Sequence, residues 1–220
     1  SEDGSRPVLT AVQVTETADG VEVVATDSYR LMWAVDRGVS LGQASGASLL
    51  VPAYTLSEVL RFAEGPLDVA IGDRRVQFRS AGVTLTSGVV EADYPNWRSL
   101  VPQSSSTTVR CEAAALADAV GRVQVAGRQA DQQVVRLRLV EGAPIALSAG
   151  SDESAADDEC DAEVTGPELT IAFNPTFLLD ALAQVEGEMT LAATDARNSV
   201  LVHRADDPDW MGLLMPVRVS

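Results

Sequence analysis

Two stretches of this chain share one pattern of apolar and polar positions. Residues 51–73 (VPAYTLSEVLRFAEGPLDVAIGD) and 173–195 (FNPTFLLDALAQVEGEMTLAATD) align without a gap at an offset of 122 residues. In both, apolar residues recur every three or four positions, as in an amphipathic helix, and then alternate with polar ones, as in a half-buried strand. We predict helices over 53–64 and 174–186, each ending at a glycine and followed by a strand and a hairpin.

The second copy extends further upstream than the first. TTVRC at 107–111 predicts a strand, and 112–127 predicts an amphipathic helix. The equivalent positions of the first copy fall before residue 5, so the first copy is expected to lack its initial strand and helix. The missing piece either belongs to a longer natural chain or has been dispensed with. Residues 95–108, rich in proline, serine and threonine, are typical of a linker.

Helices combined with antiparallel strand pairs favour an α+β fold. We predict two tandem domains, residues 1–102 and 103–220, each with antiparallel sheets and helices on one face.

The tripeptide ATD ends two strand-like runs, in ATDSYRL (25–31) and ATDARNS (193–199). An aspartate at such a point is typical of a tight turn in which its carboxylate accepts hydrogen bonds from its own backbone. The residues alone predict that Asp27 makes such a turn and that Tyr29 covers the hairpin. The recurrence also suggests a duplicated unit.

Composition narrows the classes of protein. An apolar content of 46% excludes a disordered chain, and no apolar run approaches the roughly 20 residues of a membrane span. SEDGSRPV is not a signal peptide, so we expect a cytoplasmic protein without membrane contact. The net charge is −16, from 32 acids and 16 bases that are all arginine. Bulk electrostatics therefore cannot hold nucleic acid.

The sequence contains no recognisable catalytic or metal-binding motif. Cys111 and Cys160 lack metal-site spacing and are expected to be reduced thiols. His203, the sole histidine, has no neighbouring nucleophile or metal-ligand motif. The acidic run 151–163 lacks the spacing of a calcium loop. We expect no enzymatic activity, no catalytic residue, no cofactor and no metal.

Several segments, in order, resemble one family. They are RPVLTAV (6–12), VVATDSYRL (23–31), LLVPAYTLSEVL (49–60), DYPNWRSLVP (93–102), IAFNPTFLLDAL (171–182) and LLMPVRV (213–219). These segments resemble the second and third domains of the bacterial replicative sliding clamp, the beta subunit of DNA polymerase III. In that family three similar domains form a protomer, and two protomers close a ring around duplex DNA. The resemblance implies two tandem DNA-clamp-type domains. It also implies a homo-oligomer, although two chains of this kind would supply four domains instead of six.

The family's groove between the second and third domains binds short linear motifs of DNA polymerase, clamp loader and repair proteins. Mapped by motif, the resemblance places the groove here at Leu9, Thr26, Ser28, Tyr29, Arg30, Leu31, Pro95, Leu100, Asn174, Phe177, Arg197, Ser199, Leu213, Leu214, Met215, Pro216, Val217 and Arg218. A pocket for apolar anchors suits such residues, and methionine tolerates varied anchors. Ser99 stands where the family commonly has a second basic residue, which removes one peptide contact.

Clamp domains point helices at DNA. The candidate helices carry Arg61, Arg122 and, just beyond the second helix, Arg128. Since each neutralised phosphate needs a cation, three arginines predict weak binding of duplex DNA, or binding by encirclement only.

Two functions remain open. The first is a non-catalytic processivity and recruitment module of DNA replication, which binds linear peptide motifs. The alternative is a clamp-derived regulatory or decoy protein, such as a transcription regulator fused to another DNA-binding module, that uses the same groove as a ligand sensor. The sparse arginines favour the alternative, and the groove motifs suit either.

Overall fold

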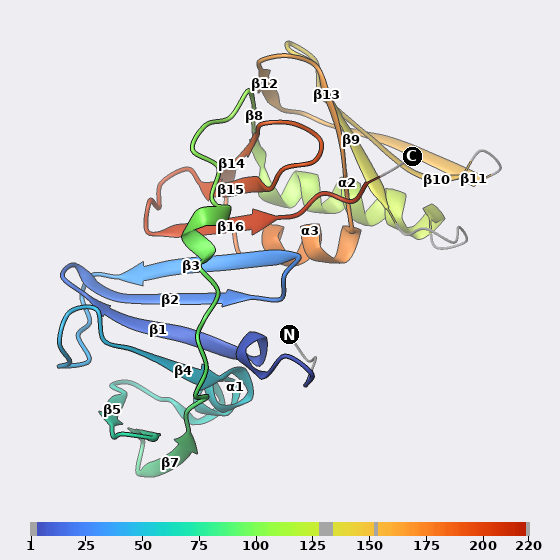
Figure 1. Ribbon diagram of the computed structural model, residues 1–220. Coiled ribbons are helices and arrows are strands. Elements are labelled where there is room, and N and C mark those ends of the chain that lie inside the picture. The colour runs from blue at the N-terminus through green and yellow to red at the C-terminus, as the bar shows by residue number, and fades with distance from the viewer. Residues whose placement is uncertain (1–3, 128–133, 152–153, 219–220) are drawn as a thin grey trace. The chain divides into compact units, whose positions relative to one another are not determined.

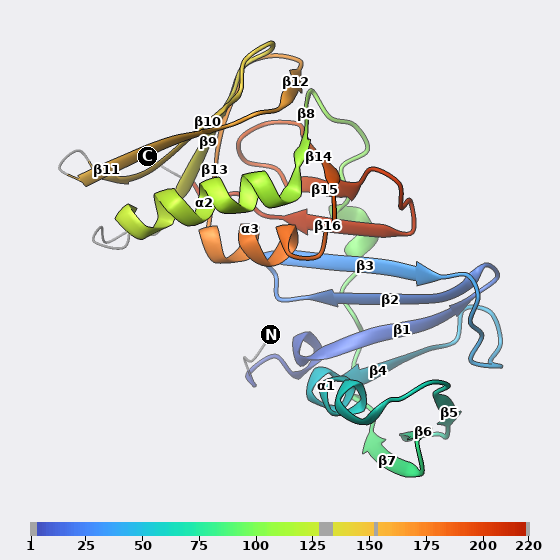
Figure 2. The ribbon, with the colours of Figure 1, turned by 180° about the vertical axis from the view of Figure 1, so that it is seen from behind.

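The computed structural model describes residues 4–127, 134–151 and 154–218. The chain forms two compact units, Ser1–Pro95 and Asn96–Ser220 (Figures 1 and 2). The predicted division at 102/103 lies in the same connecting segment. Both units combine antiparallel sheets with a few helices, which confirms the predicted α+β class.

Within residues 4–95, unit 1 has two antiparallel sheets and one α-helix. The larger sheet has the order β3-β2-β1-β4, and the smaller has the order β5-β6-β7. The elements are the 3-10 helix η1 (Pro7–Thr10), β1 (Ala11–Thr17), β2 (Gly20–Thr26), β3 (Arg30–Asp36), β4 (Ser48–Pro52), α1 (Ala53–Phe62), β5 (Asp68–Ile71), β6 (Arg75–Ser80) and β7 (Val83–Gly88).

Unit 2 has the same kind of architecture with more elements. Its sheets have the orders β11-β10-β9-β13 and β12-β8-β14-β15-β16. The elements are η2 (Trp97–Leu100), β8 (Thr107–Glu112), α2 (Ala113–Gly127), β9 (Val135–Leu139), β10 (Ile145–Ser151), β11 (Ser154–Cys160), β12 (Glu163–Thr165), β13 (Leu169–Phe173), α3 (Pro175–Leu182), β14 (Glu188–Ala193), β15 (Val200–Arg204) and β16 (Trp210–Leu214).

The two units repeat one topology. The order β3-β2-β1-β4 corresponds to β11-β10-β9-β13, and β5-β6-β7 corresponds to β14-β15-β16. Helices α1 and α3 each follow the last strand of the first set. Within residues 4–95, unit 1 has no counterpart of β8, α2 or β12. The predicted absence of an initial strand and helix from the first copy is therefore confirmed for the described residues.

Buried apolar residues at helical spacing hold the helices on the sheets. In α2 they are Ala113, Leu116, Val120 and Val123, which recur every three or four positions. The shorter helix α3 begins with Asn174, whose side-chain oxygen accepts a hydrogen bond from the Thr176 amide at 2.9 Å. Helices α2 and α3 pack side by side, as both ribbon views show.

The core of unit 1 is smaller. Val51 on β4, Val59 on α1, and Val76 and Phe78 on β6 form a buried cluster that joins the helix to both sheets. No helix in the described ranges is both long and apolar enough to cross a membrane.

Two helices end earlier than predicted. Helix α1 ends at Phe62 because Ala63 has an extended backbone, and α3 ends at Leu182, after which the amides of Gln184 and Val185 bond only three residues back. Gly65 and Gly187, with φ of 72° and 77°, therefore do not cap the helices directly. They lie in the turns that lead into β5 and β14.

Candidate functional site

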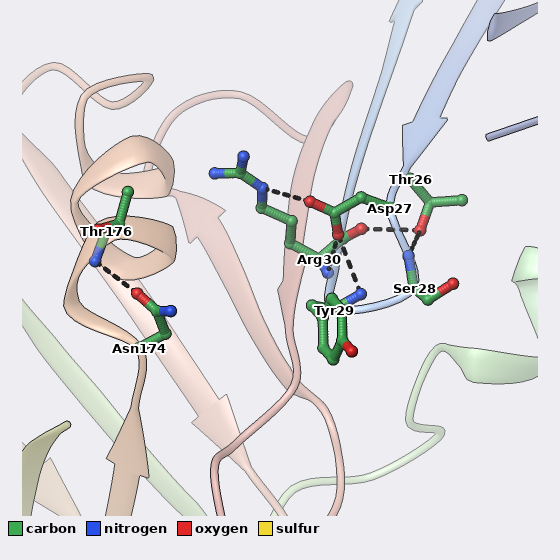
Figure 3. Close-up of polar contacts among 7 residues, drawn as sticks. All are labelled: Thr26, Asp27, Ser28, Tyr29, Arg30, Asn174 and Thr176. Atoms are coloured by element: carbon green, nitrogen blue, oxygen red, sulfur yellow. Dashed lines mark hydrogen bonds and ion pairs between the residues drawn. The ribbon is translucent and has the colours of Figure 1, made fainter. Parts of the chain in front are cut away.

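The turn between β2 and β3 is fixed by the carboxylate of Asp27. Its Oδ1 accepts hydrogen bonds from the backbone amides of Tyr29 and Arg30, each at 3.0 Å, and its Oδ2 accepts one from Arg30 Nε at 3.0 Å (Figure 3). Thr26 Oγ1 donates to the Arg30 carbonyl at 2.7 Å. Ser28, with φ of 79°, provides the left-handed step of the turn. We call residues 26–31 the Asp27 turn.

The Asp27 turn separates buried from exposed side chains. Leu31 is 1% exposed and Leu9 in η1 is 5% exposed, so these two predicted site residues are buried. Tyr29 is 58% exposed. The prediction that Tyr29 covers the hairpin is therefore not supported. Its backbone is held by Asp27 while its ring faces solvent.

The turn at Asp195 repeats this bonding. Asp195 Oδ1 accepts from the amides of Arg197 (2.7 Å) and Asn198 (2.9 Å), and Oδ2 accepts from Asn198 Nδ2 at 2.8 Å. The two backbone hydrogen bonds hold the pKa of the Asp195 carboxyl below its usual value. This turn joins β14 to β15, whereas the Asp27 turn joins β2 to β3. These positions are not equivalent in the repeat, so the recurring ATD is a shared turn and no evidence of duplication.

The last predicted site segment continues β16 toward the C-terminus. Leu213 and Leu214 are 2% and 1% exposed and pack in the core, whereas Met215 is 37% exposed. The amide of Val217 donates to the Ala172 carbonyl on β13 at 2.7 Å, which holds residues 216–218 beside the start of α3. Asn174 and the half-buried Phe177 lie at that helix start. Pro216 is half-buried and Arg218 is exposed.

A third set of predicted residues lies around η2. Ser199 Oγ donates to the Leu100 carbonyl at 2.9 Å, so the serine is buried while the Leu100 side chain stays 49% exposed. The sequence interpretation missed Trp97, which is 5% exposed within the expected linker. A lone tryptophan among prolines and serines is the signal that could have indicated a buried residue in this segment. Pro95 is exposed.

We call the residues that unit 2 contributes the C-terminal cluster. They are Leu100, Asn174, Phe177, Arg197, Ser199 and residues 213–218.

Two of the predicted DNA-facing arginines are ion-paired. Arg61 on α1 bonds Glu58 Oε1 at 2.8 Å, and Arg122 on α2 bonds Asp158 Oδ2 at 2.6 Å. Arg128 lies outside the described residues. Each pair neutralises the cation that a phosphate would need.

The two cysteines are buried and the sole histidine is half-buried. Cys111 and Cys160 are free and buried, and burial raises the pKa of the Cys111 thiol to about 12. Burial lowers the pKa of His203 on β15. The described residues contain no group of three or more metal-ligating side chains.

The repeated α+β topology of the two units, together with the matching solved clamp structures, defines a protein of the tandem DNA-clamp class. Residues 1–96 match the family model of the DNA polymerase III beta subunit, central domain, and residues 98–218 match that of its C-terminal domain. The chain therefore belongs to the DNA polymerase III beta subunit family.

Known relatives agree with this family. The chain is 30% identical to the beta sliding clamp of Streptomyces coelicolor, covering 99% of this chain and 61% of that protein. It is 27% identical to the beta sliding clamp of Bacillus subtilis, covering 97% and 58%. The crystal structures of the Streptococcus pneumoniae DNA polymerase III beta chain and the Bacillus subtilis sliding clamp each match with a TM-score of 0.90 at 27% identity, covering 100% of this chain and 59% of theirs. The chain thus spans about three fifths of the length of these relatives.

Proposed function

We propose that this chain acts as the recruiting part of a sliding-clamp-like processivity factor in DNA replication. The Asp27 turn and the C-terminal cluster would bind linear peptide motifs of DNA polymerase, clamp loader and repair proteins. The observation that carries this proposal is the 58% exposure of Tyr29 in a turn whose backbone Asp27 holds with two hydrogen bonds. A rigid exposed aromatic is typical of a binding anchor, because little conformational entropy is lost when it is covered.

The C-terminal cluster offers complementary chemistry. Met215 and Leu100 are exposed apolar side chains, and Arg197 and Arg218 are exposed cations. Apolar side chains suit the hydrophobic anchors of a peptide, and guanidinium groups bind peptide carbonyls or acidic side chains. Methionine adapts to anchors of different shape, which suits a surface shared by several partners. The proposed role is binding and needs no catalytic group.

Contact with duplex DNA is proposed to be weak or to depend on encirclement by a homo-oligomer. The net charge of −16 opposes attraction to phosphates, and Glu58 and Asp158 neutralise Arg61 and Arg122. The same two ion pairs favour the second candidate, a clamp-derived regulatory or decoy protein that keeps the peptide-binding residues without holding DNA.

Calorimetric titration with a short peptide of the glutamine-leucine-phenylalanine type tests peptide binding. We expect micromolar or tighter binding by the full chain. Tyr29→Ala and Met215→Ala should each weaken binding by about 1–3 kcal/mol, because each removes one apolar anchor contact. Both side chains are exposed, so thermal unfolding should change little.

Tyr54→Ala is the matched control. Tyr54 is a tyrosine of similar exposure, 71%, on α1 and outside both groups of binding residues. Its loss should leave peptide affinity unchanged. Equal affinity of the Tyr29, Met215 and Tyr54 variants would place the peptide site elsewhere, and no binding to the folded chain would overturn the recruiting role.

A further inference from the structure

Strand β4 of unit 1 has one edge that is bonded only in part. On one side the strand pairs with β1 along its whole length. On the other side, within the described residues, the Val90 amide donates to the Leu50 carbonyl at 2.9 Å and supplies the one hydrogen bond. The N–H and C=O of one residue in an antiparallel strand point to the same side. The Leu50 amide and both backbone groups of Ser48 therefore also point away from β1.

A hollow of about 450 Å³ lies beside this edge, and all the residues that line it belong to unit 1. The chain that follows β7 passes β4 and forms its other side (Figure 1). The half-buried side chains of Leu49, Ile71 and Val89 give the lining an apolar part. The lining shares no described residue with the Asp27 turn or the C-terminal cluster. The hollow therefore offers room for side chains of a segment that pairs with β4.

Three exposed carboxylates surround the hollow, those of Asp73, Glu91 and Asp93. Arg74 forms an ion pair with Glu91. Neither Asp73 nor Asp93 makes a side-chain hydrogen bond or an ion pair with any described residue. The rim of the hollow is therefore negatively charged, which favours basic side chains in whatever binds there.

Unit 2 repeats the backbone arrangement with the opposite charge. At the offset of 122 residues, Leu50 corresponds to Ala172 on β13, whose carbonyl accepts from the Val217 amide. The amide that bonds this edge belongs to the residue before Arg218 in unit 2 and to the residue before Glu91 in unit 1. The two edges should therefore select segments of different charge.

We propose that the edge of β4 binds an extended segment of a partner protein in which basic and apolar side chains alternate. We call Ser48–Leu50 together with residues 71–73 and 89–93 the β4 edge site. The segment would add a strand to the sheet by bonding the Leu50 amide and the backbone of Ser48. Because alternate side chains of a strand point to opposite faces, its basic side chains would meet the carboxylates while the apolar ones contact the apolar lining.

A different protein suits the β4 edge site better than a second copy of this chain. The net charge of −16 opposes the approach of another copy to an acidic rim. In the described part of the chain, the strand with alternating arginines is β9, with Arg136 and Arg138, and it is already paired on both sides by β10 and β13. This inference does not depend on peptide binding at the Asp27 turn.

The probe is an end-blocked octapeptide of alternating valine and arginine. Added to the full chain, it should slow hydrogen exchange of the Leu50 amide by about tenfold or more, because that amide becomes hydrogen-bonded. Amides of the Asp27 turn should keep their exchange rates. An octapeptide of alternating valine and glutamate is the control and should leave Leu50 unchanged, because the carboxylates of the rim repel it.

Two N-methylated versions of the probe test backbone pairing. In a strand, the valine amides face one edge and the arginine amides face the other, so only one set can bond β4. Methylation of that set should abolish binding in NMR titration, and methylation of the other set should leave binding intact. Equal binding by both versions would overturn the proposed strand addition.

Variants of exposed aspartates test the charge of the rim. Asp73→Asn and Asp93→Asn should each weaken binding of the valine–arginine probe about two- to fivefold, because each removes one ion pair. Asp19→Asn changes the net charge equally at a 77% exposed aspartate outside the β4 edge site, and should leave probe affinity unchanged. Equal effects of the three variants, equal binding of the two octapeptides, or unchanged exchange at Leu50 would overturn the proposal.

Discussion

At the residue scale, a single carboxylate fixes each of two turns. Asp27 and Asp195 both accept the amides two and three residues ahead, and both bond the side chain of the residue three ahead. The side chain that donates this third hydrogen bond differs in charge, since it is Arg30 in one turn and Asn198 in the other. The same backbone geometry therefore presents different chemistry.

Asp27→Ala removes three hydrogen bonds at once. The side chains of Asp27 and Arg30 are only 17% and 29% exposed, so their contact is partly shielded from water. We expect the free energy of unfolding to fall by about 1–2 kcal/mol in chemical denaturation. Peptide affinity should fall as well, because Tyr29 loses its fixed backbone.

Asp19→Ala serves as the control for this variant. Asp19 is 77% exposed and lies 3.9 Å from Arg37, so its loss should change stability by less than about 0.5 kcal/mol. Equal effects of the two substitutions would mean that the Asp27 turn is held by other contacts.

Asp195 gives a pH dependence with a defined sign. Its folded-state pKa lies below the usual aspartate value of 3.8. The contribution of the ionised Asp195 carboxylate to the free energy of unfolding is therefore fully present above the unfolded-state pKa. It is lost as the pH falls through the folded-state pKa. The stability difference between the natural chain and Asp195→Asn should narrow as the pH falls below about 4. Carboxyl NMR titration checks the pKa directly, and a value at or above 3.8 would contradict the expectation.

At the element scale, glycines have opposite roles in a turn and in a helix. Gly166 follows β12 with φ of 107°, and a Cβ there would overlap the carbonyl oxygen of Ser106. Gly121 lies inside α2, where a Cβ would meet nothing within 4 Å. The first position needs glycine and the second does not.

This contrast predicts opposite effects of the same substitution. Gly166→Ala should destabilise the chain by about 1–3 kcal/mol, because the backbone must shift. Gly121→Ala should stabilise it by about 0.5–1 kcal/mol, because alanine favours the helix. Thermal and denaturant unfolding measure both changes, and effects of equal sign would contradict this account.

Much of the element order could be predicted, because the helix and strand spacings at 51–73 and 173–195 survive in both copies. Contacts between residues distant in sequence could not. Trp97 was expected in a loose linker but is buried, and the pairing of Arg122 with Asp158 joins α2 to β11. Among the site residues, Leu9, Leu31, Leu213 and Leu214 match the family motif yet lie in the cores. A motif does not separate the residues that support a surface from those that form it.

At the scale of the whole molecule, charge opposes contact with DNA. The chain carries −16, and its candidate DNA-facing arginines in the described helices are engaged by carboxylates. Affinity for phosphates depends on cations that remain available to them.

Releasing those arginines should therefore raise DNA affinity. For linear duplex DNA at about 0.15 M salt, we expect a dissociation constant weaker than about 100 µM in fluorescence anisotropy. The double variant Glu58→Gln, Asp158→Asn should bind a few-fold more tightly. The double variant Glu91→Gln, Glu168→Gln changes the net charge equally but releases Arg74 and Arg138, which lie outside the helices. Equal gains in DNA affinity by the two double variants would show that affinity depends on net charge and not on the arginines of the helices.

The pairing of β8 with β14 also affects how the chain folds during its synthesis. Thr107 pairs with Ala193, so the first strand of unit 2 pairs with a strand that lies far along the sequence. Closing such a long loop costs entropy before the pairing compensates for it, which slows folding. In unit 1, short hairpins join β1 to β2 and β6 to β7, and these can form as soon as they leave the ribosome. Unit 2 therefore completes this sheet only after Glu188–Ala193 has been synthesised, and until then β8 lacks its partner strand β14.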